Sequence, residues 1–251
     1  MNTQTLNKMK QMKLHGMAGT FGANIETGKW EKYTADELIS LLVEAEWDER
    51  HNRKLDRSLK TARFRYKASV EQLSFDMERN LDKNQIKRLA DCEFIKRKEN
   101  VLITGSTGIG KSYLASALGH HACELGLKVL YQQTSKLFSR LKLAKVDGSY
   151  LREMTRIEKS DLLIIDDFGI QPLDTHSRMF MMEIMEDRHG KSSTIITSQV
   201  PVAGWYEIIG EQTIADAILD RIIHDAHRVD LKGESLRKKS VKEKVEKAQV
   251  N

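Results

Sequence analysis

A glycine-rich stretch offers the clearest chemistry in the sequence. Gly105-Ser106-Thr107-Gly108-Ile109-Gly110-Lys111-Ser112 fits the spacing G-x-x-x-x-G-K-[ST], after the apolar run NVLIT and before the amphipathic run YLASALGHHACEL. This is the strand–loop–helix context that a phosphate-binding loop requires. Its glycines let backbone N–H groups surround phosphate oxygens at a helix N-terminus. We expect Lys111 to reach the β- and γ-phosphates of a nucleotide, Ser112 to offer its hydroxyl to Mg²⁺, and Tyr113 to adjoin the nucleotide.

Two carboxylates follow a second apolar run. Asp166 and Asp167 end the sequence LLIIDD, one strand–helix unit beyond the phosphate loop. A buried parallel strand would place them at the carboxyl edge of a sheet, beside that loop. We expect Asp166 to hold Mg²⁺, directly or through water, and Asp167 to orient or deprotonate an attacking water. The alternative is a structural turn, because aspartate is common in turns.

Two later positions are candidates for sensing the γ-phosphate. The apolar run STIITSQ ends in polar residues, of which Gln199 is the one we choose for sensing phosphate or positioning water; an ordinary strand end is the alternative. Arg221 could reach the γ-phosphate of a neighbouring subunit as an arginine finger, although a surface arginine is the default. His224 and His227 are spaced as neighbours on one helical face, but no acid or cysteine completes a metal site with them.

The elements that would position these residues fall into two regions. From Asn100 onward, the apolar runs NVLIT, LKVLYQQ, DLLIIDD and STIITSQ alternate with helical stretches, which predicts an α/β fold with a parallel sheet. Residues before about 95 contain no proline and no strand-like alternation, and Thr34 with Glu37 forms a capping box that opens a long helix. We therefore predict a helical N-terminal domain over 1–95, a nucleotide-binding domain over 96–240 and a polar, disordered tail over 241–251.

Composition limits the classes of protein. The chain has 251 residues, a formal net charge of +5 and a pI near 9.0. No apolar run approaches the ~20 residues that cross a bilayer, and the N-terminus lacks the apolar core of a signal peptide. We expect a cytoplasmic protein without membrane association. Cys92 and Cys123 form no metal-binding or disulfide pattern.

The positive charge is concentrated in one stretch of the predicted long helix. Between residues 50 and 67 the only acid is Asp56, and the basic residues are Arg50, Arg53, Lys54, Arg57, Lys60, Arg63, Arg65 and Lys67. On a helix, Arg50, Arg53, Lys54 and Arg57 share one side. Together with Lys60 they are our candidates for DNA binding. A solvated helix face is the alternative.

These motifs together resemble the IstB-like ATPases, which are transposition helper proteins of bacterial insertion sequences and relatives of the DnaC helicase loader in the AAA+ initiator clade. The stretches IIDDFGIQPL and DRIIHDAHRVDLKGESLRKK carry the resemblance most specifically. It implies a Walker A motif at Lys111 and Ser112, a Walker B pair at Asp166 and Asp167, sensor 1 at Gln199 and the arginine finger at Arg221. It also implies a sensor 2 arginine, which binds nucleotide, near Arg237.

The resemblance implies an AAA+ P-loop fold, preceded by a small all-helical domain, and an ATP- and Mg²⁺-dependent activity. We expect ATP-driven self-assembly on duplex DNA with little sequence preference, recruitment or activation of a transposase, and hydrolysis that resets the assembly. A DnaC-like helicase loader shares the same ATPase core and remains an alternative. A DNA-binding scaffold that ATP switches without hydrolysis is the third possibility; the two Walker B acids argue against it.

Overall fold

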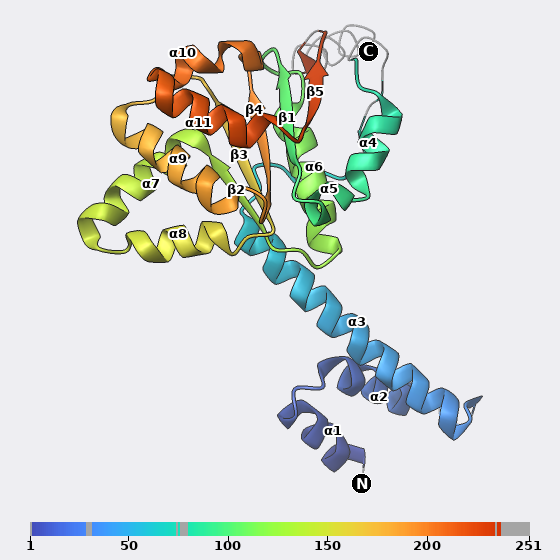
Figure 1. Cartoon of the computed structure of the whole chain (residues 1–251). Helices are drawn as coiled ribbons and strands as arrows, with labels where there is room; N and C mark the ends of the chain where they lie inside the picture. Colours follow the sequence, from blue (N-terminus) through green and yellow to red (C-terminus); the bar gives the residue numbers. More distant parts are fainter. Residues whose placement is uncertain (1, 29–31, 74, 76–79, 234, 237–251) are drawn as a thin grey trace, which may run out of the picture. The chain divides into compact units, whose positions relative to one another are not determined.

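A computed structural model gives the fold of the chain and describes residues 2–28, 32–73, 75, 80–233 and 235–236 (Figure 1). The chain divides into two compact units, residues 1–57 and residues 58–251. Each unit is described by itself. Within the described residues, no helix is long and apolar enough to cross a membrane.

The first unit is helical, as predicted. It holds α1 (Asn2–Gln11), α2 (His15–Thr27) and most of α3 (Ala35–Ala62). The predicted capping box is confirmed at the start of α3: the amide of Thr34 donates to Oε2 of Glu37 at 2.8 Å, and the amide of Glu37 donates to Oγ1 of Thr34 at 3.3 Å. This reciprocal pair satisfies N–H groups that the first helical turn leaves without partners.

Helix α2 begins directly against α3. A Cβ atom on Gly16 would lie 2.2 Å from the carbonyl oxygen of Ala45, so only glycine allows this approach. The buried carboxylate of Glu46 then accepts hydrogen bonds from the amides of Gly16 at 2.9 Å and Met17 at 3.3 Å. A negative charge at a helix N-terminus is favourable, and Glu46 therefore fixes where α2 starts.

A five-stranded parallel sheet forms the centre of the second unit. Its strands are β1 (Asn100–Gly105), β2 (Val129–Gln133), β3 (Leu162–Phe168), β4 (Ser193–Ser198) and β5 (Ala226–Leu231), in the order β2-β3-β4-β1-β5. The prediction of a parallel α/β sheet is confirmed, including all four predicted strands.

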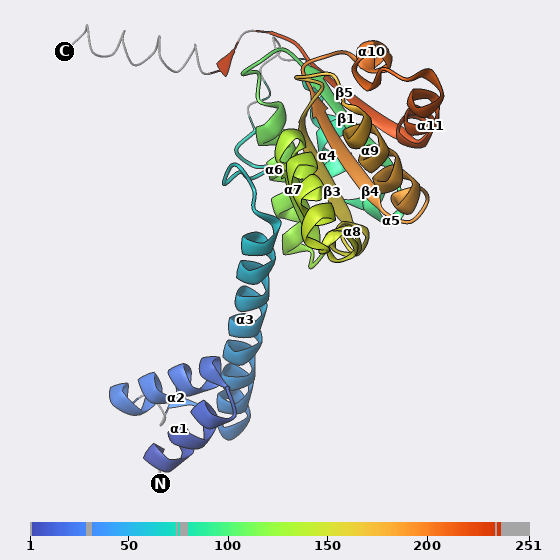
Figure 2. The same cartoon turned by 90° about the vertical axis from the view of Figure 1, so that its left-hand side faces the viewer.

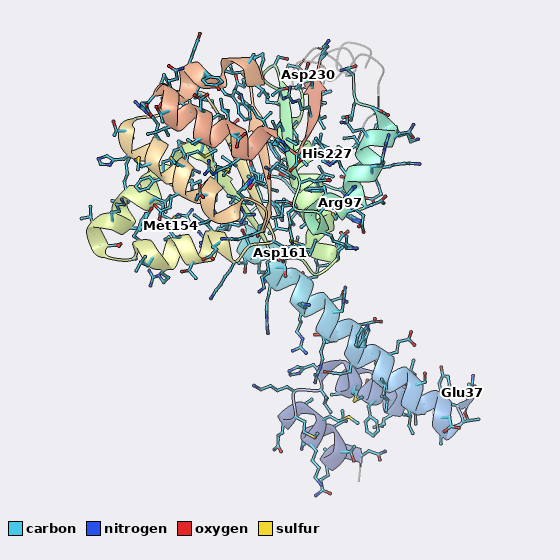
Figure 3. All side chains as sticks on the ribbon, viewed as in Figure 1. Glu37, Arg97, Met154, Asp161, His227 and Asp230 are labelled. Atoms are coloured by element: carbon cyan, nitrogen blue, oxygen red, sulfur yellow. The ribbon has the colours of Figure 1, made fainter. Side chains whose placement is uncertain are left out.

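The fifth strand was not predicted. β5 lies at the edge of the sheet, where exposed and buried residues alternate, so its sequence has no continuous apolar run. His227 lies near the start of this strand and Asp230 near its end (Figure 3). The expectation that His224 and His227 share one helical face is therefore wrong, because the helix ends before His224.

Helices cover both faces of the sheet. α6 (Lys111–Glu124) covers one face, whereas α7 (Thr134–Asp147), α8 (Tyr150–Glu158), α9 (Thr175–Arg188), the short turn η3 (Val202–Gly204), α10 (Trp205–Ile209) and α11 (Gln212–Ile223) belong to the other. Figure 2 shows α6 on the opposite side of the strands from α9 and α11. The reason is topological: only the connection from β1 to β2 runs across the sheet in the reverse direction, and parallel crossovers are right-handed.

Residues 58–99 belong to the second unit, although their sequence is not strand-like. α4 (Lys83–Ala90) and α5 (Glu93–Lys96) bury Ile86, Leu89, Phe94 and Ile95 beside the sheet domain. No described residue between 63 and 82 belongs to a helix or strand. The sequence-based boundary at 95/96 marks the change from helical to strand-rich sequence. The compact units instead meet at 57/58. The difference arises because these buried side chains pack the segment 58–95 with the sheet domain.

Candidate functional site

The phosphate loop connects β1 to α6. Gly105, Gly108 and Gly110 have φ angles of 143°, 81° and 102°, in the region that favours glycine. A Cβ atom on Gly105 would lie 2.3 Å from the carbonyl oxygen of Leu231 in β5. The glycines of the motif therefore serve both the turn itself and the close contact with the neighbouring strand.

Lys111 is buried at the start of α6, with 5% of its surface exposed. Its Nζ donates to the carbonyl oxygens of Gly105 at 2.6 Å and Ser106 at 2.8 Å. Burial lowers the pKa of Lys111, and the charges of Asp167 and Asp166 offset this only in part. The ammonium group thus lies inside the loop, where the phosphates of a nucleotide would replace backbone oxygens as its partners.

Asp166 is fully buried at the end of β3. Ser112 Oγ donates to its Oδ1 at 2.7 Å, Thr197 also donates to Oδ1, and the Tyr131 hydroxyl donates to Oδ2. Burial, together with the charge of Asp166, raises the pKa of Tyr131. The structure thus brings together the two predicted ligands of a metal ion. A hydroxyl and a carboxylate oxygen side by side fit Mg²⁺, which prefers hard oxygen ligands.

Asp167 has an unusual backbone conformation for an aspartate. Its φ is +61°, at an irregularity in the pairing of β3 with β4. Thr197 Oγ1 accepts a hydrogen bond from the Asp167 amide at 3.1 Å, and Gln133 Nε2 donates to its carboxylate at 3.1 Å. Such a conformation persists when surrounding contacts determine it, and it is frequent at functional sites. Here it falls on the second of the two predicted Walker B acids.

One cavity of about 300 Å³ gathers most of the predicted nucleotide-binding residues. Gln199 contributes to it and accepts a hydrogen bond from Oγ1 of Thr107 in the phosphate loop at 2.6 Å. The predicted residues in the lining are Thr107, Gly108, Gly110, Lys111, Ser112, Tyr113, Asp167 and Gln199. Arg65, Tyr66, Ile170 and Leu236 also line the cavity and were not predicted for this site. The only sequence signal for Arg65 was its place in the basic run.

Arg221 lies apart from this cavity, in the last turn of α11. Its backbone carbonyl accepts from Nδ2 of Asn100, the first residue of β1, at 3.2 Å, and its guanidinium pairs with Glu186. The phosphate loop starts at the other end of β1, which is about 16 Å long at the usual rise per residue. The structure therefore places Arg221 at the amino edge of the sheet and the phosphate loop at its carboxyl edge.

The candidate DNA-binding residues lie on α3. Arg50 pairs with Glu46 at 2.7 Å and Arg53 with Glu49 at 3.3 Å, whereas Lys54, Arg57 and Lys60 are exposed. The charges of Arg50 and Arg53 are therefore partly neutralised by acidic residues of the same helix. Arg237 and the predicted tail, 241–251, lie outside the described residues.

A comparison with known families identifies the chain. The family described as IstB-like ATP binding protein matches residues 7–244. The chain belongs to this IstB-like family. Within the residues that the structure describes, the IstB-like fold offers no group of three or more histidine, cysteine and acidic residues that could hold a metal ion by themselves.

Relatives match nearly the whole length. The insertion sequence ATP-binding protein y4pL of Sinorhizobium fredii is 47% identical over 234 residues, covering 93% of this chain and 96% of the relative. The ATP-binding protein of insertion sequence IS21 from Pseudomonas aeruginosa is 30% identical over 231 residues, covering 92% and 87%.

Solved structures confirm the AAA+ fold. DnaI superposes with a TM-score of 0.56 at 23% identity, covering 66% of this chain and 92% of DnaI. AMPPCP-bound DnaA from Aquifex aeolicus superposes with a TM-score of 0.58 at 18% identity, covering 74% and 56%. At these identities the likeness establishes the fold alone: the IstB-like chain has the AAA+ fold of these proteins.

Proposed function

We propose that this IstB-like protein is an ATPase that assists transposition of an insertion sequence. In this proposal ATP drives self-assembly on duplex DNA, the assembly recruits or activates the transposase of the same element, and hydrolysis resets it. The names of the relatives, which belong to insertion sequences, support the biological setting. The chemistry is argued from the residues around the cavity.

Hydrolysis rests on the acidic pair. Asp167 orients the attacking water and accepts its proton as the new P–O bond forms, while the bond from the γ-phosphorus to the β–γ bridging oxygen breaks and ADP leaves. Lys111 neutralises the phosphates at the loop, and Gln199 lies where it can contact the γ-phosphate or the water. Ser112 and Asp166 would hold Mg²⁺, which supplies charge neutralisation at the β- and γ-oxygens.

The observation that carries the proposal is the position of Arg221. A guanidinium at the amino edge of the sheet cannot reach a phosphate loop at the carboxyl edge of the same subunit, across the length of β1. An arginine finger at this place therefore serves the site of a second subunit, and self-assembly becomes a condition for full activity. Its pairing with Glu186 on α9 is the contact it would exchange for phosphate.

DNA binding is assigned to the exposed cations of α3. Lys54, Arg57 and Lys60 have no ion pair within the part of the chain that the structure describes. Free cations along a helix suit phosphate groups, which they would bind without reading base sequence. This agrees with the absence of a groove-reading motif in the sequence.

Light scattering tests the assembly. The mass of the protein is measured with and without ATP, and with and without duplex DNA. We expect a multi-subunit complex only when ATP and DNA are present together. A protein that stays monomeric in all four conditions contradicts the proposal, because Arg221 would then have no neighbouring site.

Pull-down experiments with ATP and DNA distinguish the partner. We expect capture of the transposase of the same insertion sequence and no capture of a replicative helicase. The reverse result favours the helicase-loader alternative. Equal turnover of Asp167→Asn and wild type would instead favour a scaffold that ATP switches without hydrolysis.

A further inference from the structure

Arg65 connects the segment that leaves α3 to the acidic pair. Its Nη1 donates to Oδ2 of Asp167 at 2.9 Å and to Oδ2 of Asp166 at 3.4 Å. It also lines the cavity of the phosphate loop, together with Lys111. An arginine from far upstream in the chain therefore lies among the groups to which hydrolysis has been assigned.

The local sequence directs Arg65 to this place. α3 ends at Ala62 because Arg63 takes a left-handed conformation, with φ +60°, and its amide bonds the carbonyl of Leu59 at 3.3 Å. Phe64 then packs on α6, with its ring centroid 4.3 Å from that of His120. A Cβ atom on Gly119 would lie 2.5 Å from the Phe64 ring, so the glycine makes room for it. Phe64 thus anchors the segment one residue before Arg65.

The guanidinium of Arg65 places a positive charge beside both acids. This charge offsets the repulsion between two adjacent carboxylates and the phosphates of a nucleotide. Arg65 and Gln133 both donate to Oδ2 of Asp167, which fixes the direction of the other oxygen, Oδ1.

We propose that Arg65 is a positioning residue for hydrolysis: it holds the Asp167 carboxylate in the orientation that the attacking water needs, and it ties this orientation to the end of α3. The inference rests on the proposed function, in which Asp167 acts on the water. It adds a residue of the same subunit to the site, supplied by the continuation of the helix that carries the DNA-binding cations. A change at the end of α3 can thereby alter turnover without altering the phosphate loop.

The first test separates turnover from binding. We expect Arg65→Ala to lower kcat for ATP by about tenfold or more, because a misdirected Asp167 would lose part of the roughly 10²–10⁴-fold that a positioned general base contributes. Affinity for a fluorescent ATP analogue should stay within about threefold of wild type, because Lys111 and the loop are intact. Arg65→Lys should recover part of the loss, since it keeps the charge but not the planar group. Lys67→Ala, which removes an exposed cation two residues further along, is the matched control and should turn over like wild type.

A double-mutant cycle tests whether Arg65 acts through Asp167. In single-turnover measurements, Arg65→Ala added to Asp167→Asn should change the rate by less than about twofold, because the carboxylate it positions is already gone. A full additional loss overturns the inference, as does an Arg65→Ala protein with unchanged or faster turnover. Arg65→Gln, which keeps the side-chain stem as far as Cδ but not the charge, replaces Arg65→Ala if the latter melts at a lower temperature. Wild-type turnover by Asp167→Asn alone would instead refute the hydrolytic role of Asp167 in the proposed function.

Discussion

Thr107 Oγ1 donates a hydrogen bond to Oε1 of Gln199 at 2.6 Å, joining the phosphate loop to the residue that follows β4. Both side chains line the same cavity, next to Lys111 and Asp167. A nucleotide that enters this cavity meets the two residues together. If nucleotide binding moves the phosphate loop, this hydrogen bond would transmit the movement to Gln199 and the end of β4.

Replacing Gln199 should impair turnover more than binding. We expect Gln199→Ala to lower kcat by about tenfold or more, because a polar group near the γ-phosphate and the water is lost. Affinity for ATP should change by less than about threefold, since backbone groups of the loop hold the phosphates. Steady-state hydrolysis and fluorescent-nucleotide titration measure the two quantities. Gln212→Ala, at the exposed start of α11, is the control; an equal loss there would mean that the effect at Gln199 is not specific.

Mixing two inactive variants should restore activity. We expect Arg221→Ala to bind ATP but lose DNA-stimulated hydrolysis, and Asp167→Asn to assemble but turn over slowly. In an equal mixture, about one quarter of sites combine Asp167 of one subunit with Arg221 of its neighbour, so about a quarter of wild-type turnover should return. ATPase assays in the presence of DNA measure this recovery.

The control for this mixture removes the complementing arginine. Arg221→Ala mixed with an Arg221→Ala, Lys111→Ala double variant should stay inactive, because neither subunit supplies Arg221. If the first mixture forms assemblies by light scattering but shows no recovery, Arg221 does not act between subunits.

The salt dependence of DNA binding should show whether the exposed cations of α3 contact DNA phosphates. Replacing Lys54, Arg57 and Lys60 together by alanine should reduce the slope of log K against log salt by about 2.7, at roughly 0.9 for each phosphate contact. Fluorescence anisotropy with a labelled duplex, in ATP, measures the slope. A triple variant at the exposed residues Lys87, Lys128 and Lys159 removes the same charge from the ATPase unit. Equal slopes for the two triple variants would refute the assignment to α3.

Glu46 should make the first unit sensitive to acid. Burial alone would raise its pKa, but hydrogen bonds from Arg50 and from the amides of Met17 and Gly16 outweigh burial, and its pKa is lowered. A carboxylate with a lowered pKa stabilises the fold above its unfolded-state pKa of about 4.3, and this contribution disappears as the pH falls through the folded-state value. Glu46→Gln should cost about 1 kcal/mol near neutral pH and progressively less in acid.

Hydrogen exchange of α2 in the full chain measures this effect, with each variant compared with wild type at the same pH. Glu49→Gln is the matched control, because Glu49 is a half-exposed residue of the same helix and pairs with Arg53 at 3.3 Å. Its replacement should have little effect on α2. A loss of protection in Glu46→Gln that is the same at every pH would contradict the role of its charge.

The phosphate loop and the acidic pair could be predicted because their signals are local. The motif 105–112 stands between a strand and a helix, and Asp166 follows an apolar run, so the geometry of parallel strands brings both to one edge of the sheet. The contacts of Ser112 with Asp166 and of Thr107 with Gln199 are the consequence. Only the parallel direction of the strands was needed, and the alternation of strands and helices supplied it.

Other features depend on contacts that no local pattern records. Arg65 lies in a segment that the sequence assigned to the helical domain, whereas the structure ends α3 at Ala62. Its partners are the Walker B acids, far along the chain. β5 follows α11 after Ile223 with no glycine or proline to separate them, and its alternating exposure at the sheet edge resembles no buried strand. Tertiary packing decides both cases, through the Phe64 contact on α6 and through pairing with β1.

The separation of Arg221 from the phosphate loop of its own subunit gives any assembly a direction. In the proposed assembly each protomer would offer an arginine on one side and receive one on the other, so contacts would be head-to-tail and an open assembly would have two unlike ends. The terminal protomer at one end would hold a site that no arginine completes. Turnover per protomer would therefore rise with the length of an open assembly and reach its full value only when the assembly closes on itself. Short assemblies would therefore remain on DNA with unhydrolysed ATP at one end. The bound ATP would distinguish that end from the other for a partner protein.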